Sequence, residues 1–376
     1  MTSVTSRSRR RVEELLAGTG VVINGQNPWD IRVHDDRLFA RVLADGSLGF
    51  GEAYMDGWWD APALDDCLTR ILRQGLRAKV RPSVSLLKDA IGARIANLQS
   101  KRRAFIVGER HYDAGNDLYQ AMLDARLTYT CGYWKEAQTL DEAQEAKLDL
   151  VCRKIGLRPG QRVLDIGCGW GSFAKYAAEK YGAHVVGITV SREQLKLGRE
   201  LCKDLPVELR LQDYRDVNEP FDHVISLGMV EHVGYKNYRD YFAVARRCIT
   251  GDGFFLLHTI GDNVSSRFSD PWIDKYIFPN SMLPSAAQLA RAAEGLFVME
   301  DWHGFHASYY DKTLMAWYRN TEAHWPQLKD RYDDRFHRMW TFYLNACAGL
   351  FRSRSIQLWQ IVYSPRGILG GYVAVR

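Results

Sequence analysis

The sequence predicts an α/β domain with a mostly parallel sheet, preceded by a smaller, mainly helical domain. The chain has 376 residues, which at about 150 residues per domain allows two or three domains. From about residue 146, apolar β-branched runs alternate with segments of helical periodicity, the pattern of a parallel sheet covered on both faces. Residues 1–100 lack this alternation. We therefore predict an N-terminal domain over 1–100, a linker over 101–115 and an α/β domain over 116–376.

The composition narrows the class of protein. With 46% hydrophobic and 25% charged residues, the chain can build a sizeable core, which excludes wholesale disorder. No apolar run approaches the roughly 20 residues that span a bilayer, and the polar, basic first residues do not resemble a secretory signal. The seven cysteines lie far apart and form no CxxC pair, so we expect a reducing cytosol rather than disulfides or a zinc knuckle.

The first hundred residues contain two notable segments. Residues 46–59 are rich in glycine and aromatic side chains, which predicts tight turns around a small apolar core that covers Trp58 and Trp59. Pro82 then opens a helical pattern whose apolar residues share one face up to Leu98, with basic residues beside that stripe. Such a helix fits an anionic membrane surface, or it packs on its own domain with a solvated basic face.

Positive charge is concentrated near the predicted domain junction. Residues 73–110 hold ten basic and two acidic side chains, a net +8, whereas the whole chain carries only +5. A local field of this size predicts an anionic partner: nucleic acid, phospholipid headgroups or an acidic protein. Nucleic acid is disfavoured because the basic segment lies apart from the motif-rich region.

The elements of the α/β domain follow in order along the chain. We predict strands at 162–166, 184–189, 207–211, 223–227, 254–258 and 356–363, and helices at 172–181, 192–202 and 238–248. In such sheets, ligands bind beyond the carboxyl ends of the strands.

A glycine-rich loop follows the first of these strands. Gly167, Gly169 and Gly171 let the backbone turn sharply and approach a ligand closely. Asp165 precedes the loop, and a carboxylate there suits a cationic or zwitterionic ligand better than a pyrophosphate. An NAD site also needs an acid at the end of the second strand, where Thr189 stands instead. The loop therefore argues against NAD.

The loop resembles motif I of the class I S-adenosylmethionine-dependent methyltransferases, which have a Rossmann-like, seven-stranded sheet. Further segments resemble the bacterial cyclopropane-fatty-acyl-phospholipid synthases over nearly the whole chain. They are His111–Tyr119, Leu127–Trp134, Gly228–Gly234, Leu257–Gly261, Asp270–Asn280, Tyr310–Leu314 and Asn345–Gly349, together with the 51–59 block.

The resemblance implies an activity and its partners. The family transfers a methylene from S-adenosylmethionine to the cis double bond of an unsaturated phospholipid acyl chain, forming a cyclopropane ring, with a bicarbonate ion held in the site. It further implies a cytoplasmic homodimer that attaches peripherally and reversibly to the inner face of the cytoplasmic membrane.

The resemblance also implies the residues of the bicarbonate site. They are Cys131, Glu231, His258, Ile260 and Tyr310. Backbone N–H groups near Cys131 and Ile260, with side-chain donors from His258 and Tyr310, can hold an anion. Tyr309 is a weaker rival for the tyrosine. Taken one by one, Cys131 also reads as a small buried hydrophobe, Glu231 as part of a helix cap and His258 as a core histidine.

The cofactor residues that the resemblance implies surround the glycine loop. They are Tyr129, Thr130, Asp165, Gly167, Gly169, Thr189, Gln194, Asp213 and Tyr214. Tyr214 is expected to stack on the adenine. Aromatic faces elsewhere in the matched segments suit a carbocation, although core packing accounts for about half of them.

Two alternatives to ring formation stay open. One is a related lipid methyltransferase that gives methyl-branched products, and the other is a non-catalytic lipid- or nucleic-acid-binding protein. His303 and His306 have metal-ligand spacing, but no cysteine or acid completes a set, so we expect no metal.

Overall fold

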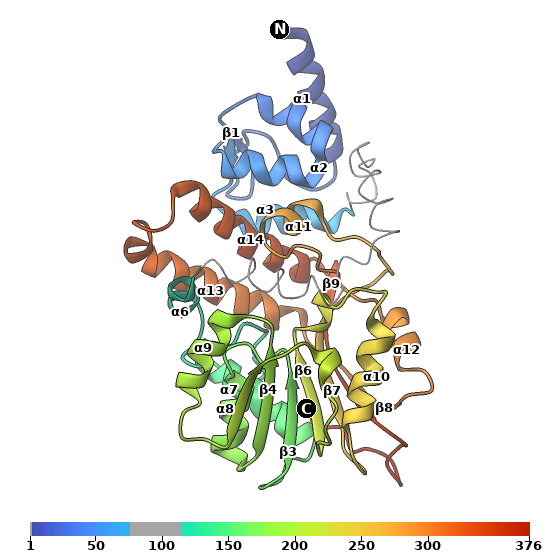
Figure 1. Ribbon diagram of the computed structural model, residues 1–376. Helices are drawn as coiled ribbons and strands as arrows, with labels where there is room; N and C mark the ends of the chain where they lie inside the picture. The colour runs from blue at the N-terminus through green and yellow to red at the C-terminus, as the bar shows by residue number, and fades with distance from the viewer. Residues whose placement is uncertain (1, 76–114) are drawn as a thin grey trace. The chain divides into compact units, whose positions relative to one another are not determined.

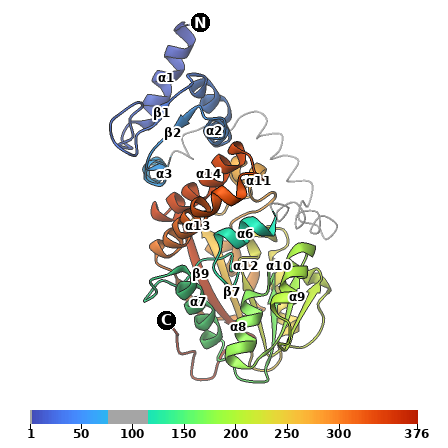
Figure 2. The ribbon, with the colours of Figure 1, turned by 90° about the vertical axis from the view of Figure 1, so that its left-hand side faces the viewer.

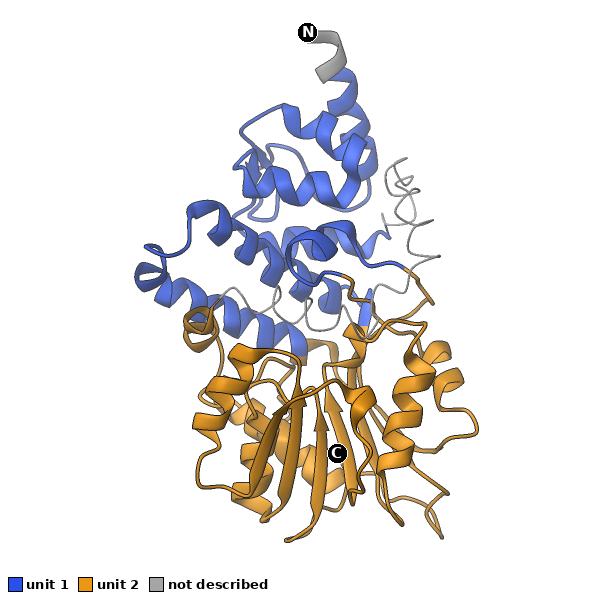
Figure 3. Cartoon of the chain, viewed as in Figure 1, with its two compact units in different colours: residues 1–97, 268–279, 310–356 blue, residues 98–267, 280–309, 357–376 orange. Residues whose placement is uncertain are grey.

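A computed structural model describes residues 2–75 and 115–376 (Figure 1). The chain forms two compact units, coloured separately in Figure 3. The first comprises 1–97, 268–279 and 310–356, and the second 98–267, 280–309 and 357–376. The predicted linker and the helix from Pro82 lie outside the described residues, so the boundary near residue 100 stays a prediction. The sequence did not indicate that segments after residue 267 belong with the N-terminal unit.

The described part of the first unit is mainly helical, in line with prediction. Its elements are α1 (Thr2–Leu16), β1 (Arg32–Val33), α2 (Arg37–Met55), β2 (Trp59–Asp60), α3 (Leu64–Arg73), α11 (Pro271–Tyr276), most of α13 (Ala307–Leu328) and α14 (Asp334–Arg352). Helix α14 packs against α2 and α3. A Cβ on Gly349 would lie 3.1 Å from the backbone nitrogen of Thr69, so glycine permits this close approach of α14 and α3.

The glycine-rich block of this unit is helical over residues 47–55, which corrects the prediction of turns there, whereas the predicted tight turn is found at 56–58, where Gly57 has a φ of 74°. Helix α2 is kinked at Gly46, whose φ of 58° is left-handed, and then continues through the block. A Cβ on Gly51 would lie 2.4 Å from the Trp272 ring, so glycine serves here for close packing. The predicted apolar cover for Trp59 is confirmed, since its buried ring stacks on Phe50 at a centroid distance of 4.2 Å.

The first unit also buries a carboxylate with its charge fully matched. The Glu52 side chain accepts hydrogen bonds from Lys275 Nζ at 2.6 Å, from the Tyr276 hydroxyl at 2.7 Å and from Arg41. Burial alone would raise the pKa of Glu52, but these donors lower it to about 2. Glu52 therefore joins α2 to α11 as a permanent anion.

The second unit contains the predicted α/β sheet, seen from two sides in Figures 1 and 2. Its strands are β3 (Arg162–Ile166), β4 (His184–Thr189), β5 (Val207–Leu211), β6 (His223–Leu227), β7 (Phe255–Asp262), β8 (Val298–Gly304) and β9 (Ile356–Ser364). Its helices are α6 (Asn116–Met122), α7 (Leu140–Lys154), α8 (Ser172–Tyr181), α9 (Arg192–Leu201), α10 (Tyr238–Cys248) and α12 (Ala286–Ala293), with short 3-10 turns η2 (Tyr214–Asp216) and η3 (Val230–His232).

Among the described residues the sheet has seven strands in the order β5-β4-β3-β6-β7-β9-β8. The pairs from β5 to β7 are parallel, whereas β8 runs antiparallel to β9. The strand order reverses between β3 and β6, which places a topological switch point at their carboxyl ends. The predicted strands and helices of this unit are confirmed to within a few residues, while β8 was not predicted.

Alternating side chains give the sheet two apolar faces. Leu164 and Val224 belong to a core covered by α10 and α12, whereas Val163 and Ile225 belong to a core covered by α7 and α8. This arrangement explains why the strands are apolar throughout rather than alternating with polar residues. No helix in the described part of the chain is both long and apolar enough to cross a bilayer.

Candidate active site

The glycine loop lies at the carboxyl end of β3, at the switch point of the sheet. Gly167 and Gly169 have φ values of 85° and 56°, which favour glycine, and Gly171 begins α8 in a left-handed conformation. A Cβ on Gly167 would lie 2.6 Å from the Met229 side chain, so a larger residue would clash there. The loop is anchored to the neighbouring strand β4, because the N–H groups of Gly167 and Cys168 both donate to the carbonyl of Ile188. The geometry suits close approach of a ligand to the backbone.

Asp165 is buried at the base of this loop. Burial raises its pKa to about 7, and the nearby Lys147 ammonium works in the opposite direction. The carboxyl is therefore poised between its charged and neutral forms, and a cation bound at the loop would favour the charged form.

Two further cofactor candidates meet at the end of β4. The Thr189 hydroxyl donates to Gln194 Oε1 at 2.9 Å and accepts from the N–H of Ser191 at 3.1 Å. Ser191 in turn caps α9 by accepting from the N–H of Gln194. Thr189 thus organises the strand-to-helix turn at the position where many class I methyltransferases carry an acid.

Asp213 and Tyr214 lie after β5, and both already have protein partners. Asp213 accepts from the backbone N–H and the guanidinium of Arg215, each at 2.9 Å. The Tyr214 ring belongs to the apolar core, 5.3 Å from the Tyr241 ring, with the Arg215 guanidinium 4.6 Å from its centroid. Core packing is thus one role of Tyr214, and stacking on adenine stays a prediction.

Helix α7 holds the segment that carries Tyr129, Thr130 and Cys131. Gln144 Nε2 donates to the carbonyl of Thr130 at 2.7 Å, and Lys147 Nζ donates to the Thr130 hydroxyl at 2.7 Å. A Cβ on Gly228 would lie 2.8 Å from Thr130 Cγ2, so the end of β6 packs closely against the same residue. The Tyr129 ring meets the Tyr119 ring edge-on at 5.2 Å.

Two of the predicted bicarbonate residues, Glu231 and Ile260, are in contact, and His258 lies two residues before Ile260 on β7. Glu231 lies on η3 after β6, while His258 and Ile260 lie on β7. Glu231 Oε1 accepts the N–H of Ile260 at 2.8 Å. This contact corrects one expectation: the Ile260 N–H serves the buried carboxyl of Glu231 instead of being left for an anion.

The remaining polar atoms of this cluster are buried without partners. Among the described residues, neither ring nitrogen of His258 nor Oε2 of Glu231 has a hydrogen-bond partner. Burial raises the pKa of Glu231 to about 7, against the pull of the Ile260 N–H, and lowers the pKa of His258 well below its ordinary value. Buried polar atoms normally find partners, so these atoms mark a place for a small polar ligand.

Cys131 is fully buried in the same unit, and its thiol donates to the carbonyl of Gly132 at 3.1 Å.

The two candidate tyrosines differ in position. Tyr310 belongs to the first unit, where its ring stacks on Phe351 at 4.4 Å, so its place in the site stays a prediction. Tyr309 belongs to the second unit, and burial and then the Cys131 thiol raise its pKa.

The two histidines with metal-ligand spacing, His303 and His306, contact different partners. His303 Nδ1 lies 2.9 Å from Lys154 Nζ, whereas His306 Nδ1 lies 2.7 Å from the Ser308 hydroxyl. Within residues 2–75 and 115–376, no cluster of metal-ligating side chains occurs.

Sequence reasoning missed Lys147, whose ammonium donates to Thr130 and acts on the pKa values of both Asp165 and His258. The signal was present, because Lys147 falls on the apolar stripe of α7 together with Leu140, Ala143 and Val151. A lysine on the buried face of an amphipathic helix is unusual and points to a specific partner.

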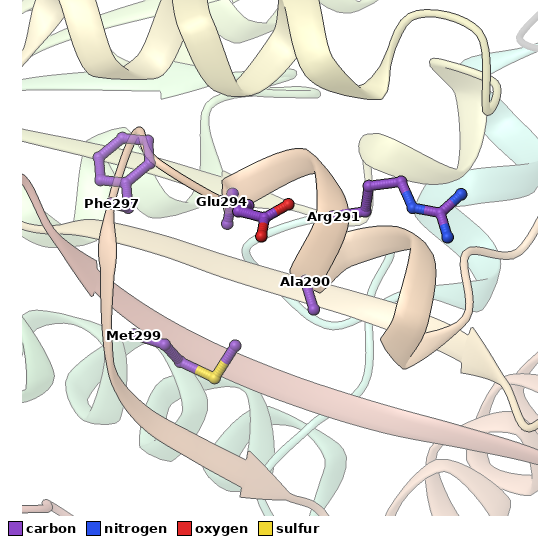
Figure 4. A pocket seen from close by; sticks show the side chains of 6 residues that line it. Ala290, Arg291, Glu294, Phe297 and Met299 are labelled. Carbon is purple, nitrogen blue, oxygen red and sulfur yellow. The ribbon is translucent and has the colours of Figure 1, made fainter.

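A separate pocket of about 420 Å³ lies beside α12 and the start of β8. It is lined by Ala290, Arg291, Ala293, Glu294, Phe297 and Met299 (Figure 4). None of the predicted site residues lines it, so we do not assign it to the reaction.

Comparison with known proteins identifies the family. The mycolic acid cyclopropane synthetase family matches residues 99–361. The chain is 54% identical to the cyclopropane-fatty-acyl-phospholipid synthase of Escherichia coli over 367 residues, spanning 98% of this chain and 96% of that protein. It is 34% identical to sphingolipid C9-methyltransferase A of Emericella nidulans, covering 67% of this chain and 52% of that protein.

A solved structure shows the same relationship. The mycolic acid cyclopropane synthase CmaA1, complexed with S-adenosylhomocysteine and CTAB, superposes with a TM-score of 0.64 at 32% identity, covering 69% of this chain and 98% of that one. The predicted resemblance and the predicted methyltransferase fold are thus both confirmed. The chain belongs to the cyclopropane synthase family of S-adenosylmethionine-dependent enzymes, and it carries that family's class I methyltransferase sheet.

Proposed function

We propose that this protein is a cyclopropane-fatty-acyl-phospholipid synthase. In the proposed reaction, the methylene from S-adenosylmethionine adds to the cis double bond of an unsaturated phospholipid acyl chain. An unactivated alkene is a poor nucleophile, and the methylated intermediate is a carbocation that must lose a proton to close the ring. The site must therefore position the sulfonium, exclude water and remove a proton.

The observation that carries the proposal is the buried, incompletely partnered pair Glu231 and His258. Glu231 has one oxygen held by the Ile260 N–H and one without a partner among the described residues. His258 is 1% exposed and has both ring nitrogens without partners there. Buried titratable groups with shifted pKa values and open hydrogen-bonding atoms suit contact with a reacting ligand, and these two side chains are the predicted site residues that have both properties.

The same atoms fit bicarbonate. His258 can donate one hydrogen bond, and Glu231 can accept the hydroxyl hydrogen of the ion or, when protonated, donate to it. Cys131 and one of the two tyrosines complete the proposed set. When bound, bicarbonate would supply the acceptor for the proton that the carbocation loses. The role of Glu231 and His258 is then to hold and orient that acceptor.

The cofactor side of the site is proposed to consist of the glycine loop, Asp165 and the Thr130 segment. The left-handed Gly167 and Gly169 allow the backbone to approach the cofactor, and the buried carboxyl of Asp165 complements its positive charge. Thr189 and Gln194 would face the ribose, where hydroxyl and amide groups replace the usual carboxylate.

The test is a reaction with vesicles of defined unsaturated phospholipid and S-adenosylmethionine labelled in its methyl group. Label in a cyclopropane acyl chain, identified by mass and NMR spectra, is the expected result. Label found only in methyl-branched or unsaturated methylated chains would overturn the ring-forming proposal. It would instead support the second candidate, a lipid C-methyltransferase, which the 34% identity to the sphingolipid methyltransferase favours over other classes.

We also propose that the enzyme is a homodimer that works at the cytoplasmic membrane surface. The homodimer rests on the family resemblance alone, and the support for membrane attachment is the charge of residues 73–110, most of which lie outside the described residues. A double charge reversal at Lys101 and Arg102 should weaken binding to anionic vesicles, most clearly at low salt. Unchanged vesicle affinity in a sedimentation assay would contradict this attachment site.

A further inference from the structure

We propose that Lys147 is the buried counter-charge for the anion site, a positioning residue that makes the cluster of Cys131, Glu231 and His258 selective for a small oxyanion. The inference deepens the proposed function and rests on it for the identity of the anion. It assigns a role to a side chain that the reaction scheme above leaves unused.

The first argument is the position of Lys147. It lies in the middle of α7 and is fully buried. Its ammonium donates to the Thr130 hydroxyl at 2.7 Å, and Thr130 is the residue directly before Cys131. One helical turn earlier, Gln144 donates to the carbonyl of Thr130. Helix α7 therefore holds Thr130 by two hydrogen bonds. Lys147 therefore fixes both the geometry and the electrical potential beside Cys131.

The second argument is the incomplete pairing of this charge. An ammonium group carries three donors, and the Thr130 hydroxyl is the hydrogen-bond partner that the described residues supply. No described carboxylate lies within 4.0 Å of Lys147 Nζ to form an ion pair. A buried charge without direct compensation is costly, so a ligand that supplies negative charge would be favoured.

The third argument is the set of groups that Lys147 influences. Burial lowers the pKa of Lys147 to about 8, against the attraction of Asp124, Cys131 and Asp165. The ammonium form therefore predominates at pH 7. After burial, the charge of Lys147 is also the largest influence on the pKa of His258. One cation thus acts on the cofactor loop and on the anion residues together.

Asp124 does not neutralise this cation directly. Its carboxylate accepts from the N–H groups of Thr128 and Arg126 and from the Thr128 hydroxyl, which ties it to its own turn. Asp165 lies at the base of the glycine loop, forms no ion pair with Lys147 within 4.0 Å, and burial raises its pKa, which disfavours its charged form. An oxyanion at the Glu231 and His258 cluster would complete the charge balance.

The experiment measures bicarbonate binding without turnover. The full chain is freed of bicarbonate, and its melting temperature is followed against bicarbonate concentration for the wild type, Lys147→Met and Lys147→Arg. Lys154→Met is the matched comparison: it removes a second buried lysine from α7, which pairs with His303 at 2.9 Å, lies 3.9 Å from Asp301 and acts on the pKa of His258 less strongly than Lys147 does.

The expected result is a half-saturating bicarbonate concentration that rises about tenfold or more in Lys147→Met, because a buried charge near the ligand is lost. Lys147→Arg should recover part of this affinity, and Lys154→Met should stay within about threefold of the wild type. Equal bicarbonate affinity in Lys147→Met and the wild type would overturn the inference, as would equal weakening in both methionine variants.

The outcome is distinguishable from failure of the proposed function. A wild type that forms labelled cyclopropane chains but is not stabilised by bicarbonate would overturn the anion site and this role of Lys147, while leaving the ring-forming activity intact. A wild type that binds bicarbonate in a Lys147-dependent manner but forms no ring would support this inference and overturn the activity.

Discussion

Two buried glutamates, one in each compact unit, show how the same side chain serves opposite purposes. Glu52 is 8% exposed and Glu231 is 6% exposed. Three donors from α2 and α11 surround Glu52 and lower its pKa to about 2. Glu231 receives one backbone N–H on one oxygen, keeps the other without a partner among the described residues, and has its pKa raised to about 7.

The number of partners distinguishes a structural buried carboxyl from one that is open to a ligand. A carboxylate that is paired with cations stays charged and fixes the packing of the side chains around it. A carboxyl left half-satisfied in a dry site is costly to folding and persists where a ligand or a proton transfer completes it. Glu52 therefore belongs to the architecture of the first unit, whereas for Glu231 we predict a role in the chemistry of the second.

The largest expected effect is a loss of ring-forming activity when Glu231 is replaced. Glu231→Gln should lower ring formation by about 10²–10⁴-fold, because the amide cannot hold and orient the proposed proton acceptor, bicarbonate, as the carboxyl does. The measurement is the yield of labelled cyclopropane chains from phospholipid vesicles, with the melting temperature as a control for folding. A Glu231→Gln enzyme with full ring-forming activity would contradict the proposed role of Glu231 in the anion site.

The mirror experiment tests Glu52. Glu52→Ala should destabilise the protein by about 3 kcal/mol, because it leaves Lys275 and Arg41 without their buried partner. Urea unfolding measures this loss. Since Arg41 also pairs with Asp56 at 2.7 Å, Asp56→Asn serves as a comparison that removes a more exposed carboxylate, together with its second ion pair to Arg335 at 2.9 Å. A smaller loss for Glu52→Ala than for Asp56→Asn would contradict the comparison.

The pH dependence of stability should have opposite signs at the two sites. The pKa of Glu231 rises from 4.5 to about 7 on folding, so its contribution is complete below pH 4.5 and is lost as the pH rises through 7. The pKa of Glu52 falls from 4.5 to about 2, so its contribution is present above pH 4.5 and is lost as the pH falls through 2.

The measurement is the free energy of unfolding of the wild type minus that of each glutamine variant. Because Asp165 also has a pKa of about 7, only this difference isolates Glu231. For Glu231→Gln the difference should change between pH 5 and 8, and for Glu52→Gln it should change below pH 4.5. Parallel pH curves for both variants would remove the distinction between them.

The smallest effect concerns the tyrosine of the anion site. Tyr310→Phe should lower ring formation about tenfold through loss of one hydrogen bond to a charged ligand, and Tyr309→Phe should change it by less than about threefold. Both variants keep the aromatic packing, so each controls for the other. The reverse order would assign the role to Tyr309, which lies in the same unit as Glu231 and near the Cys131 thiol.

Much of the second unit could be predicted from local sequence patterns. The strands Arg162–Ile166 and His223–Leu227 and the helix Ser172–Tyr181 begin and end where the periodicity of the sequence indicates. The loop could be recognised from its glycines. A sharp turn after a strand needs a left-handed backbone, and few residues other than glycine adopt that conformation easily. In the first unit, the glycines at 46–51 predicted turns, but packing against Trp272 and Arg41 keeps the segment helical.

The site was predicted only as a set of residues. Cys131, Glu231 and His258 follow from the resemblance, but their state depends on what surrounds them. The N–H of Ile260 binds Glu231, a contact that links residues 29 positions apart. Lys147 was passed over because its importance comes from the groups that the folded chain brings to it.

The sequence by itself determined the order of strands and helices and the glycine loop, since these depend on local periodicity and on the backbone requirements of single residues, and its matched motifs indicated the family by resemblance. Only the tertiary structure decided which buried groups are charged. The pKa of a glutamate depends on the donors and the solvent around it, and those are supplied by segments far away in the chain, α11 for Glu52 and β7 for Glu231.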